Sequence, residues 1–265
     1  MARNFNGSSD IIDTPAQQWP QNAMALCAHI NPTSVTVGQL IASMYQGSPS
    51  TPSAAYCQFG ILNPGILFSR IQLLIDNIYI ERDSNSSVIS AGSWQHVAMT
   101  WNGGTANTAI SSYLNGIQID TTNNGLGVFT GPYTGNGVQF FIGAQRSGPP
   151  QSVFGGPLAD VVLYNVALTQ AEIIALARGA RPNRIRPQSI VRWYPLDGYN
   201  HPALDRSFQK ANGVLTGTSF AAGPPLLNPA PILLSLPDPT VVLPAVRIPP
   251  VPPPPPPGGW AEIDW

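Results

Sequence analysis

The chain reads SWQHVAMTWNG at residues 93–103, YLNG at 113–116, FFIG at 140–143, FGGPLADVVLYN at 154–165 and ALTQAEI at 167–173, and these segments decide its fold. Aromatic and β-branched residues form short runs here, and glycine, proline and asparagine separate the runs. Short strands with such regular punctuation indicate a β-sandwich or jelly roll. Asn115-Gly116 is the strongest hairpin signal, because both residues tolerate positive φ.

The same pattern continues on both sides of this stretch. A strand that leads into a turn is predicted at 5–10, and further strands are predicted at 23–30, 38–45, 66–75, 78–82, 97–101, 138–142 and 160–164. Asp76-Asn77 suits a tight hairpin between two of them. One helix is expected after Thr169, because Thr169 and Glu172 form an S/T-x-x-E capping box and Gly179 can end the helix in a left-handed conformation.

This order of motifs resembles the laminin G-like family of concanavalin A-like jelly rolls. The resemblance rests on Trp94-x-His96-Val97-Ala98 and on the strand with Asp160, Tyr164 and the helix after it, and it covers residues 3–218. It implies an all-β, concanavalin A-like jelly-roll sandwich with one short helix. Residues 190–198 resemble the strand that usually opens such a domain, yet here they come last. The domain is therefore expected to be circularly permuted, which a sandwich with adjacent termini tolerates.

Composition changes at residue 224, so we predict a sandwich domain over residues 1–223 and a separate arm over 224–265. The arm holds more than half of the 29 prolines, and proline favours an extended, polyproline-like chain. Its apolar residues need a surface to cover them, on the same domain or on a neighbouring subunit. The candidate anchors of this partner-binding arm are Leu233, Leu234, Leu236, Val241, Val242, Leu243, Ile248, Trp260, Ile263 and Trp265.

Charge and hydropathy exclude several classes of partner. Only 9% of residues are charged and the formal net charge is -1, so nucleic-acid binding is not expected. No apolar run is long enough to span a bilayer. The first residues lack the apolar core of a secretory signal, so synthesis in a cytoplasm is expected. Such synthesis favours buried free thiols at Cys27 and Cys57 over a disulfide.

No catalytic motif is recognised. Retaining glycosidases of this fold use clustered carboxylates, often Glu-x-Asp-x-x-Glu along one strand, because the acid and the nucleophile must lie about 5 Å apart. The three glutamates, Glu81, Glu172 and Glu262, form no such motif. His96 reads as a structural strand histidine. The chain is therefore predicted not to be an enzyme.

Ligand sites are less well defined. No cofactor is predicted; calcium is a less favoured alternative, with oxygen ligands among Asp10, Asp13, Asn102, Asn107, Asp120, Asn123 and Asn124. A glycan could stack on an aromatic residue near a turn, namely Trp19, Tyr45, Tyr56, Tyr133 or Tyr199. A group of arginines forms either an interface patch or a solvated connection, and its members are Arg178, Arg181, Arg184 and Arg186.

The resemblance and the arm together suggest a non-enzymatic structural protein of a tailed-bacteriophage virion, of the capsid decoration or head-fibre type. Such a protein would form a homo-oligomer and would bind a capsid or other virion protein through its arm. Its location would be the virion, after synthesis in the host cytoplasm. The alternative is a carbohydrate-binding adhesion module on a virion or a bacterial surface.

Overall fold

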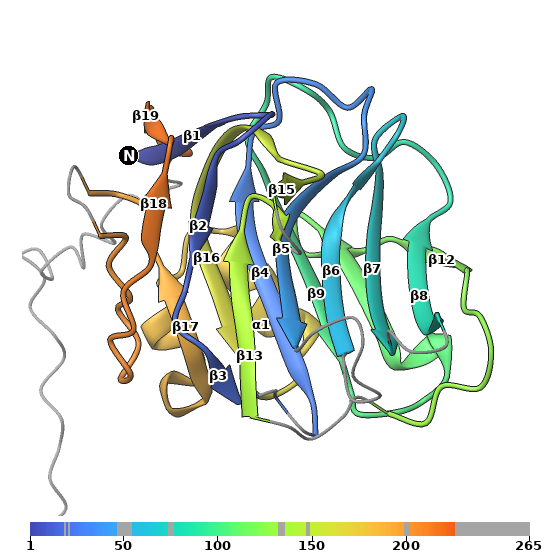
Figure 1. Cartoon of the computed structure of the whole chain (residues 1–265). Helices are drawn as coiled ribbons and strands as arrows, with labels where there is room; N and C mark the ends of the chain where they lie inside the picture. The colour runs from blue at the N-terminus through green and yellow to red at the C-terminus, as the bar shows by residue number, and fades with distance from the viewer. Residues whose placement is uncertain are drawn as a thin grey trace, which may run out of the picture. The chain divides into compact units, whose positions relative to one another are not determined.

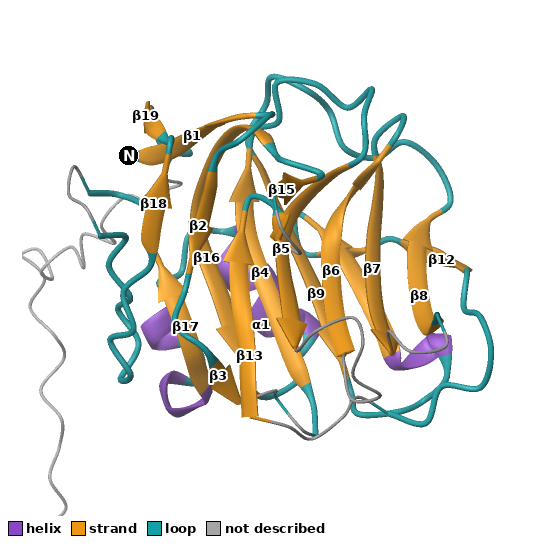
Figure 2. Ribbon diagram, in the orientation of Figure 1, coloured by secondary structure: helices purple, strands orange, loops and turns teal. Residues whose placement is uncertain are grey.

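The computed structural model describes residues 1–18, 20, 22–46, 55–73, 77–131, 136–146, 149–198 and 202–225. All of these belong to one compact unit, Met1–Leu227. Two large antiparallel sheets face each other in this unit, and one α-helix lies outside them (Figures 1 and 2). The all-β jelly-roll sandwich with one short helix is confirmed.

Sheet A contains eight of the described strands. In spatial order they are β11 (Ile117–Gln118), β10 (Ile110–Leu114), β9 (Gln95–Trp101), β4 (Met24–Ile30), β16 (Gly155–Tyr164), β1 (Ala2–Asn6) and β19 (Ser219–Ala221), with β17 (Ile190–Tyr194) also paired to β16.

Sheet B contains nine of the described strands. They are β12 (Asp120–Asn123), β8 (Ile78–Ser84), β7 (Ile66–Leu73), β6 (Ala55–Leu62), β5 (Gln39–Gln46), β13 (Asn136–Ile142), β2 (Ile11–Asp13) and β18 (Val214–Thr216), with β3 (Gln17–Gln18) paired to β13. A small hairpin, β14 (Gln145–Arg146) and β15 (Pro150–Gln151), forms a separate ladder.

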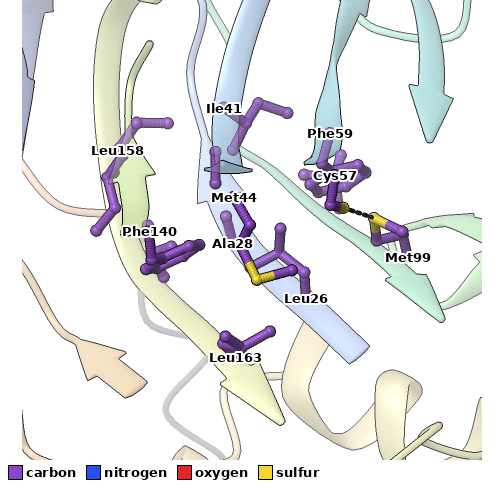
Figure 3. Close-up of a cluster of buried hydrophobic side chains, with 14 of the residues drawn as sticks. Leu26, Ala28, Ile41, Met44, Cys57, Phe59, Met99, Phe140, Leu158 and Leu163 are labelled. Atoms are coloured by element: carbon purple, nitrogen blue, oxygen red, sulfur yellow. Dashed lines mark hydrogen bonds between the residues drawn. The ribbon is translucent and has the colours of Figure 1, made fainter. Parts of the chain in front are cut away.

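The main core lies between the two sheets. Strand side chains alternate between the faces, and most of those that point inward are apolar and almost completely buried. Figure 3 shows this layer, in which Cys57 donates to the sulfur of Met99 at 3.8 Å. Its labelled members include Leu26, Met99, Leu158 and Leu163 from sheet A and Ile41, Met44, Phe59 and Phe140 from sheet B.

A second apolar cluster lies on the outer face of sheet A, under helix α1 (Gln170–Ala177). Ile173 and Leu176 of the helix pack there against Cys27, Ala98 and other strand residues. The predicted capping box is present: Thr169 accepts from the Glu172 amide, and the Glu172 carboxylate accepts from the Thr169 amide. Gly179 ends the helix at φ 89°, as predicted.

Short 3-10 turns precede β10 and follow the helix. They are η1 (Asn107–Ala109), η2 (Pro182–Arg184) and η3 (Pro187–Ser189). Pro182 and Pro187 each open one of the last two turns, because the fixed φ of proline suits the first position of a helical turn.

The hairpin at Asn115-Gly116 is confirmed, and so is the antiparallel pairing of β7 with β8, whereas Asp76 of the second predicted turn lies outside the described residues. Asn115 and Gly116 have φ values of 50° and 86° between β10 and β11, and Asn77, at φ 52°, precedes β8, which pairs with β7. The sequence analysis missed β6, a central strand of sheet B. Its interior residue Gly60 weakens the strand pattern, yet a Cβ at this position would lie 2.4 Å from the Gln39 carbonyl oxygen.

The last described segments complete both sheets. β17 pairs with β16, and β18 pairs with β2. Ala2 and Ala221 are cross-strand partners, so the first and last strands of the sandwich lie side by side. This is the geometry that a circular permutation needs, and the permutation itself stays a prediction.

Cys27 and Cys57 are buried free thiols, as expected. They lie in different sheets, and burial raises the pKa of both thiols. In the part of the chain that the structure describes, no helix is long and apolar enough to cross a membrane. The predicted arm beyond residue 225, with all its candidate anchors, lies outside the described residues.

Candidate functional site

The outer face of sheet B carries a line of side chains that crosses neighbouring strands. Strand pairing places one outward residue of each strand in the same row. From β2 to β8 the row contains Asp13, Phe141, Ser43, Gln58, Arg70 and Glu81. One half of this row is covered, and the other half is polar.

The covered half lies beneath the β14–β15 hairpin. The Ser43 hydroxyl donates to the Ala144 carbonyl at 2.9 Å, and the Gln58 amide donates to the Gln145 side chain. Phe141 and Ala144 are buried in a small apolar cluster against which Tyr45 packs. This hairpin therefore closes the β5 and β13 side of the face.

The polar half comprises the outward side chains of β6, β7 and β8. We call it the β6–β8 face, and its residues are Gln58, Arg70, Gln72, Tyr79, Glu81 and Asp83. Arg70 is central: its guanidinium pairs with Glu81 and lies 4.3 Å from the centre of the Tyr79 ring. Glu81 is only 3% exposed, although it lies on the outer side of the sheet. Its backbone amide donates to the Asn107 side chain at 3.1 Å.

Asp83 lies two residues further along the same face and is 4% exposed. The Asn124 amide donates to its Oδ2, but Oδ1 is buried without a hydrogen-bond partner among the described residues. Burial, followed by the charge of Glu81, raises the pKa of Asp83 to about 6. Asn124 and Arg70 oppose this shift only in part.

Gln72 shows the same incomplete hydrogen bonding. Its amide nitrogen donates to the Asn77 side chain at 2.6 Å. Its Oε1 is buried and has no partner in the described part of the chain. Buried polar atoms are nearly always hydrogen-bonded in native proteins, so the oxygens of Gln72 and Asp83 are two acceptors that lack a donor among the described residues.

The sequence analysis missed this site. Glu81 and Asp83 do form a Glu-x-Asp pair on one side of a strand, but position 86, where the glycosidase motif has its second glutamate, is Ser86. The alternation along β8 was the available signal. Ile80 is buried in the core, whereas its neighbours in sequence, Tyr79 and Glu81, point to the outer face.

Comparison with known proteins identifies the family. Residues 6–174 match the sequence model of a family described as the concanavalin A-like lectin/glucanases superfamily. The chain belongs to this superfamily. No curated protein sequence matches the chain.

Several solved structures resemble the fold of the chain. A heptameric SAP-like pentraxin from Limulus polyphemus has a TM-score of 0.54 at 19% identity, over 82% of this chain and 93% of that one. A putative carbohydrate binding protein from Bacteroides ovatus has a TM-score of 0.56 at 18% identity, over 86% and 61% of the two chains. The enzymatically active domain of tailspike protein 2 from bacteriophage CBA120 has a TM-score of 0.50 at 14% identity, over 71% and 28%. At such identities these likenesses show the fold alone.

Among the aromatic residues predicted to stack on a glycan, two lie close to the β6–β8 face. Tyr45 is partly buried at its border, and Tyr56 pairs in register with Tyr45 and Gln72. The other three, Trp19, Tyr133 and Tyr199, lie outside the described residues. Trp101 and Trp193 are buried, whereas Trp94 is partly exposed.

The side chains considered as calcium ligands make hydrogen bonds or ion pairs within the protein. Asp120 accepts from the Ser112 amide and from Arg82, and Asp10 accepts from the Asn6 amide. Asn107 and Asn124 bind the backbone of Glu81 and the carboxylate of Asp83. Across the described ranges, no three His, Cys, Asp or Glu side chains lie close enough to hold a metal ion together.

The predicted interface arginines lie at the end of α1 and around η2. Arg178 caps the helix and Arg181 caps η2, and both are exposed, as is Arg184. Arg186 pairs with Glu172 at 2.6 Å. The structure therefore leaves both interpretations open for the first three residues, while Arg186 stabilises the helix start.

Proposed function

We propose that the chain is a carbohydrate-binding protein without catalytic activity, and that the β6–β8 face is its glycan site. One observation carries this proposal: Gln72 and Asp83 hold buried acceptor oxygens without partners, beside a charged and aromatic row. An unsatisfied buried acceptor costs about 1–3 kcal/mol. Sugar hydroxyl groups are donors that would remove this cost.

The neighbouring side chains suit the same ligand. The apolar faces of sugar rings pack on aromatic side chains. Tyr45 and Tyr79 are both partly exposed, and Tyr79 is the cross-strand partner of Gln72. The Arg70 guanidinium offers donors for sugar oxygens. The printed description of the Bacteroides ovatus protein, a putative carbohydrate binding protein of the same fold, supports the proposal.

The carboxylates favour binding over hydrolysis. Glu81 is held in an ion pair with Arg70, which occupies the carboxylate that a retaining glycosidase would need as its nucleophile. Ser86 replaces the second glutamate of the glycosidase motif. Turnover of any polysaccharide by the purified chain would contradict this part of the proposal.

A glycan array followed by titration calorimetry tests the binding. Gln72→Leu removes the unpartnered acceptor and should weaken binding of the selected glycan at least about tenfold, consistent with the cost of a lost hydrogen bond. Gln118→Leu is the matched control, because Gln118 is exposed on sheet A. Equal affinities for the two variants would rule out Gln72 as a ligand residue.

The second candidate is a structural component of a phage particle, which is favoured by the proline-rich segment after residue 224. The tailspike domain of bacteriophage CBA120 has the same fold. The two functions are compatible, because a particle protein can also bind glycans. Detection of the chain in purified virions by mass spectrometry would support this candidate, and its consistent absence would remove it.

A further inference from the structure

Two histidines face each other on the outer side of sheet A, away from the β6–β8 face. His29 of β4 and His96 of β9 are direct cross-strand partners. Their ring centres are 4.9 Å apart with an interplanar angle of 65°. His29 is partly exposed and His96 is 3% exposed, so the pair lies just below the protein surface.

The backbone explains why the rings are so close. The His96 amide donates to the Asn115 side chain at 2.9 Å, and its carbonyl accepts from the Asn115 amide at 2.8 Å. Both polar groups of His96 thus point toward Asn115 and away from β4. His29 and His96 therefore occupy a non-hydrogen-bonded position of the β4–β9 ladder, where opposing side chains approach most closely.

The chemistry of the rings is that of a ligand pair. The Nδ1 atoms of His29 and His96 are both buried, and neither has a hydrogen-bond partner among the described residues. Burial lowers the pKa of His29 to about 4, and burial together with His29 lowers the pKa of His96. Both imidazoles are therefore neutral at pH 7, the form that binds metal ions.

We propose that His29 and His96 form a two-histidine site for a late first-row divalent metal ion, with Zn²⁺ and Cu²⁺ as the best matches. Imidazole nitrogen suits these ions, whereas calcium requires oxygen ligands. No third His, Cys, Asp or Glu joins the pair within the described ranges, so the proposed site has two protein ligands and would need solvent to supply the others. This site is independent of the glycan site, because it lies on the other sheet.

Titration of the full-length chain, purified without a histidine tag, tests the site. Isothermal titration with Zn²⁺ should show one ion bound per chain, and the melting temperature should rise with added Zn²⁺. His29→Gln should weaken this binding more than about tenfold, since loss of even an indirect contact to a metal ligand costs about 10–100-fold. His201→Gln, at the third histidine of the chain, is the matched control and should bind as the unmodified protein does.

His29→Gln carries the test if His96→Gln fails to fold, because His29 is the partly exposed member of the pair. Electron paramagnetic resonance of bound Cu²⁺ gives a second readout. It should report two nitrogen ligands in the unmodified chain and fewer in His29→Gln. Zn²⁺ affinity that is unchanged in His29→Gln, or equally reduced in His201→Gln, would overturn the proposal, as would a chain that binds no Zn²⁺.

Discussion

At the scale of single residues, Asp83 has the most unusual environment on the β6–β8 face. Its pKa is raised to about 6 by burial and by Glu81. The folded state holds this proton more tightly than the unfolded chain does. Asp83 therefore contributes stability below its unfolded pKa, and this contribution is lost as the pH rises through about 6.

Asp83→Asn should remove this dependence. The difference in unfolding free energy between Asp83→Asn and the unmodified chain should shift in favour of the variant as the pH rises from 4 to 7. Urea denaturation at several pH values measures it. The difference between the two proteins reports on Asp83 alone, because the contribution of His29 and His96 to the pH dependence is present in both and cancels. A difference that stays constant with pH would contradict the assigned environment.

Individual residues also show why the fold could be predicted from the sequence and the site could not. Asn115-Gly116 and the Thr169–Glu172 box act over a few neighbours, so their signals are readable locally. Glu81 acquires its role from Arg70, eleven positions away, and His96 from His29 on another strand. Such pairs depend on strand register, which cannot be read from the sequence alone.

At the scale of elements, helix α1 begins at a capping box. Thr169→Ala should lower the unfolding free energy by about 1 kcal/mol, the usual cost of losing a threonine N-cap. Thr105→Ala is the control, because Thr105 is exposed in a loop. Chemical denaturation measures both variants, and equal stabilities would show that the box contributes little.

The β10–β11 hairpin and the helix are in direct contact. Gly116 has φ 86°, and a Cβ there would lie 2.8 Å from the Ile174 side chain. Gly116→Ala should therefore destabilise the protein more than Gly92→Ala, since Gly92 also has positive φ (74°) but nothing within 4 Å of its Cβ position. Thermal unfolding of both variants makes the comparison. Equal losses would mean that backbone strain alone, without the helix contact, sets the cost.

At the scale of the whole molecule, the strand pattern predicted the sandwich because most core strands alternate clearly. β6 escaped prediction, since Gly60 is required by close packing against Gln39 and breaks the pattern. The last strand also matters for any truncation. β19 pairs with β1, so a chain that ends at residue 218 would lose part of sheet A.

The arm is expected to drive assembly. A chain that ends at residue 225 tests this, because it lacks the arm and keeps every described strand. Light scattering should show a defined oligomer for the full-length chain and a monomer for this shorter chain. The physical reason is that the many apolar residues of the arm need a covering surface. If both chains are monomers, the arm does not drive assembly.

The most direct test of the central claim is to locate a bound glycan on the protein. Backbone amide chemical shifts should be followed by NMR while the glycan selected on the array is added. The largest shifts are expected in β7 and β8, at Arg70, Gln72, Tyr79 and Asp83. Shifts confined to other surfaces, or no glycan selected at all, would contradict the claim.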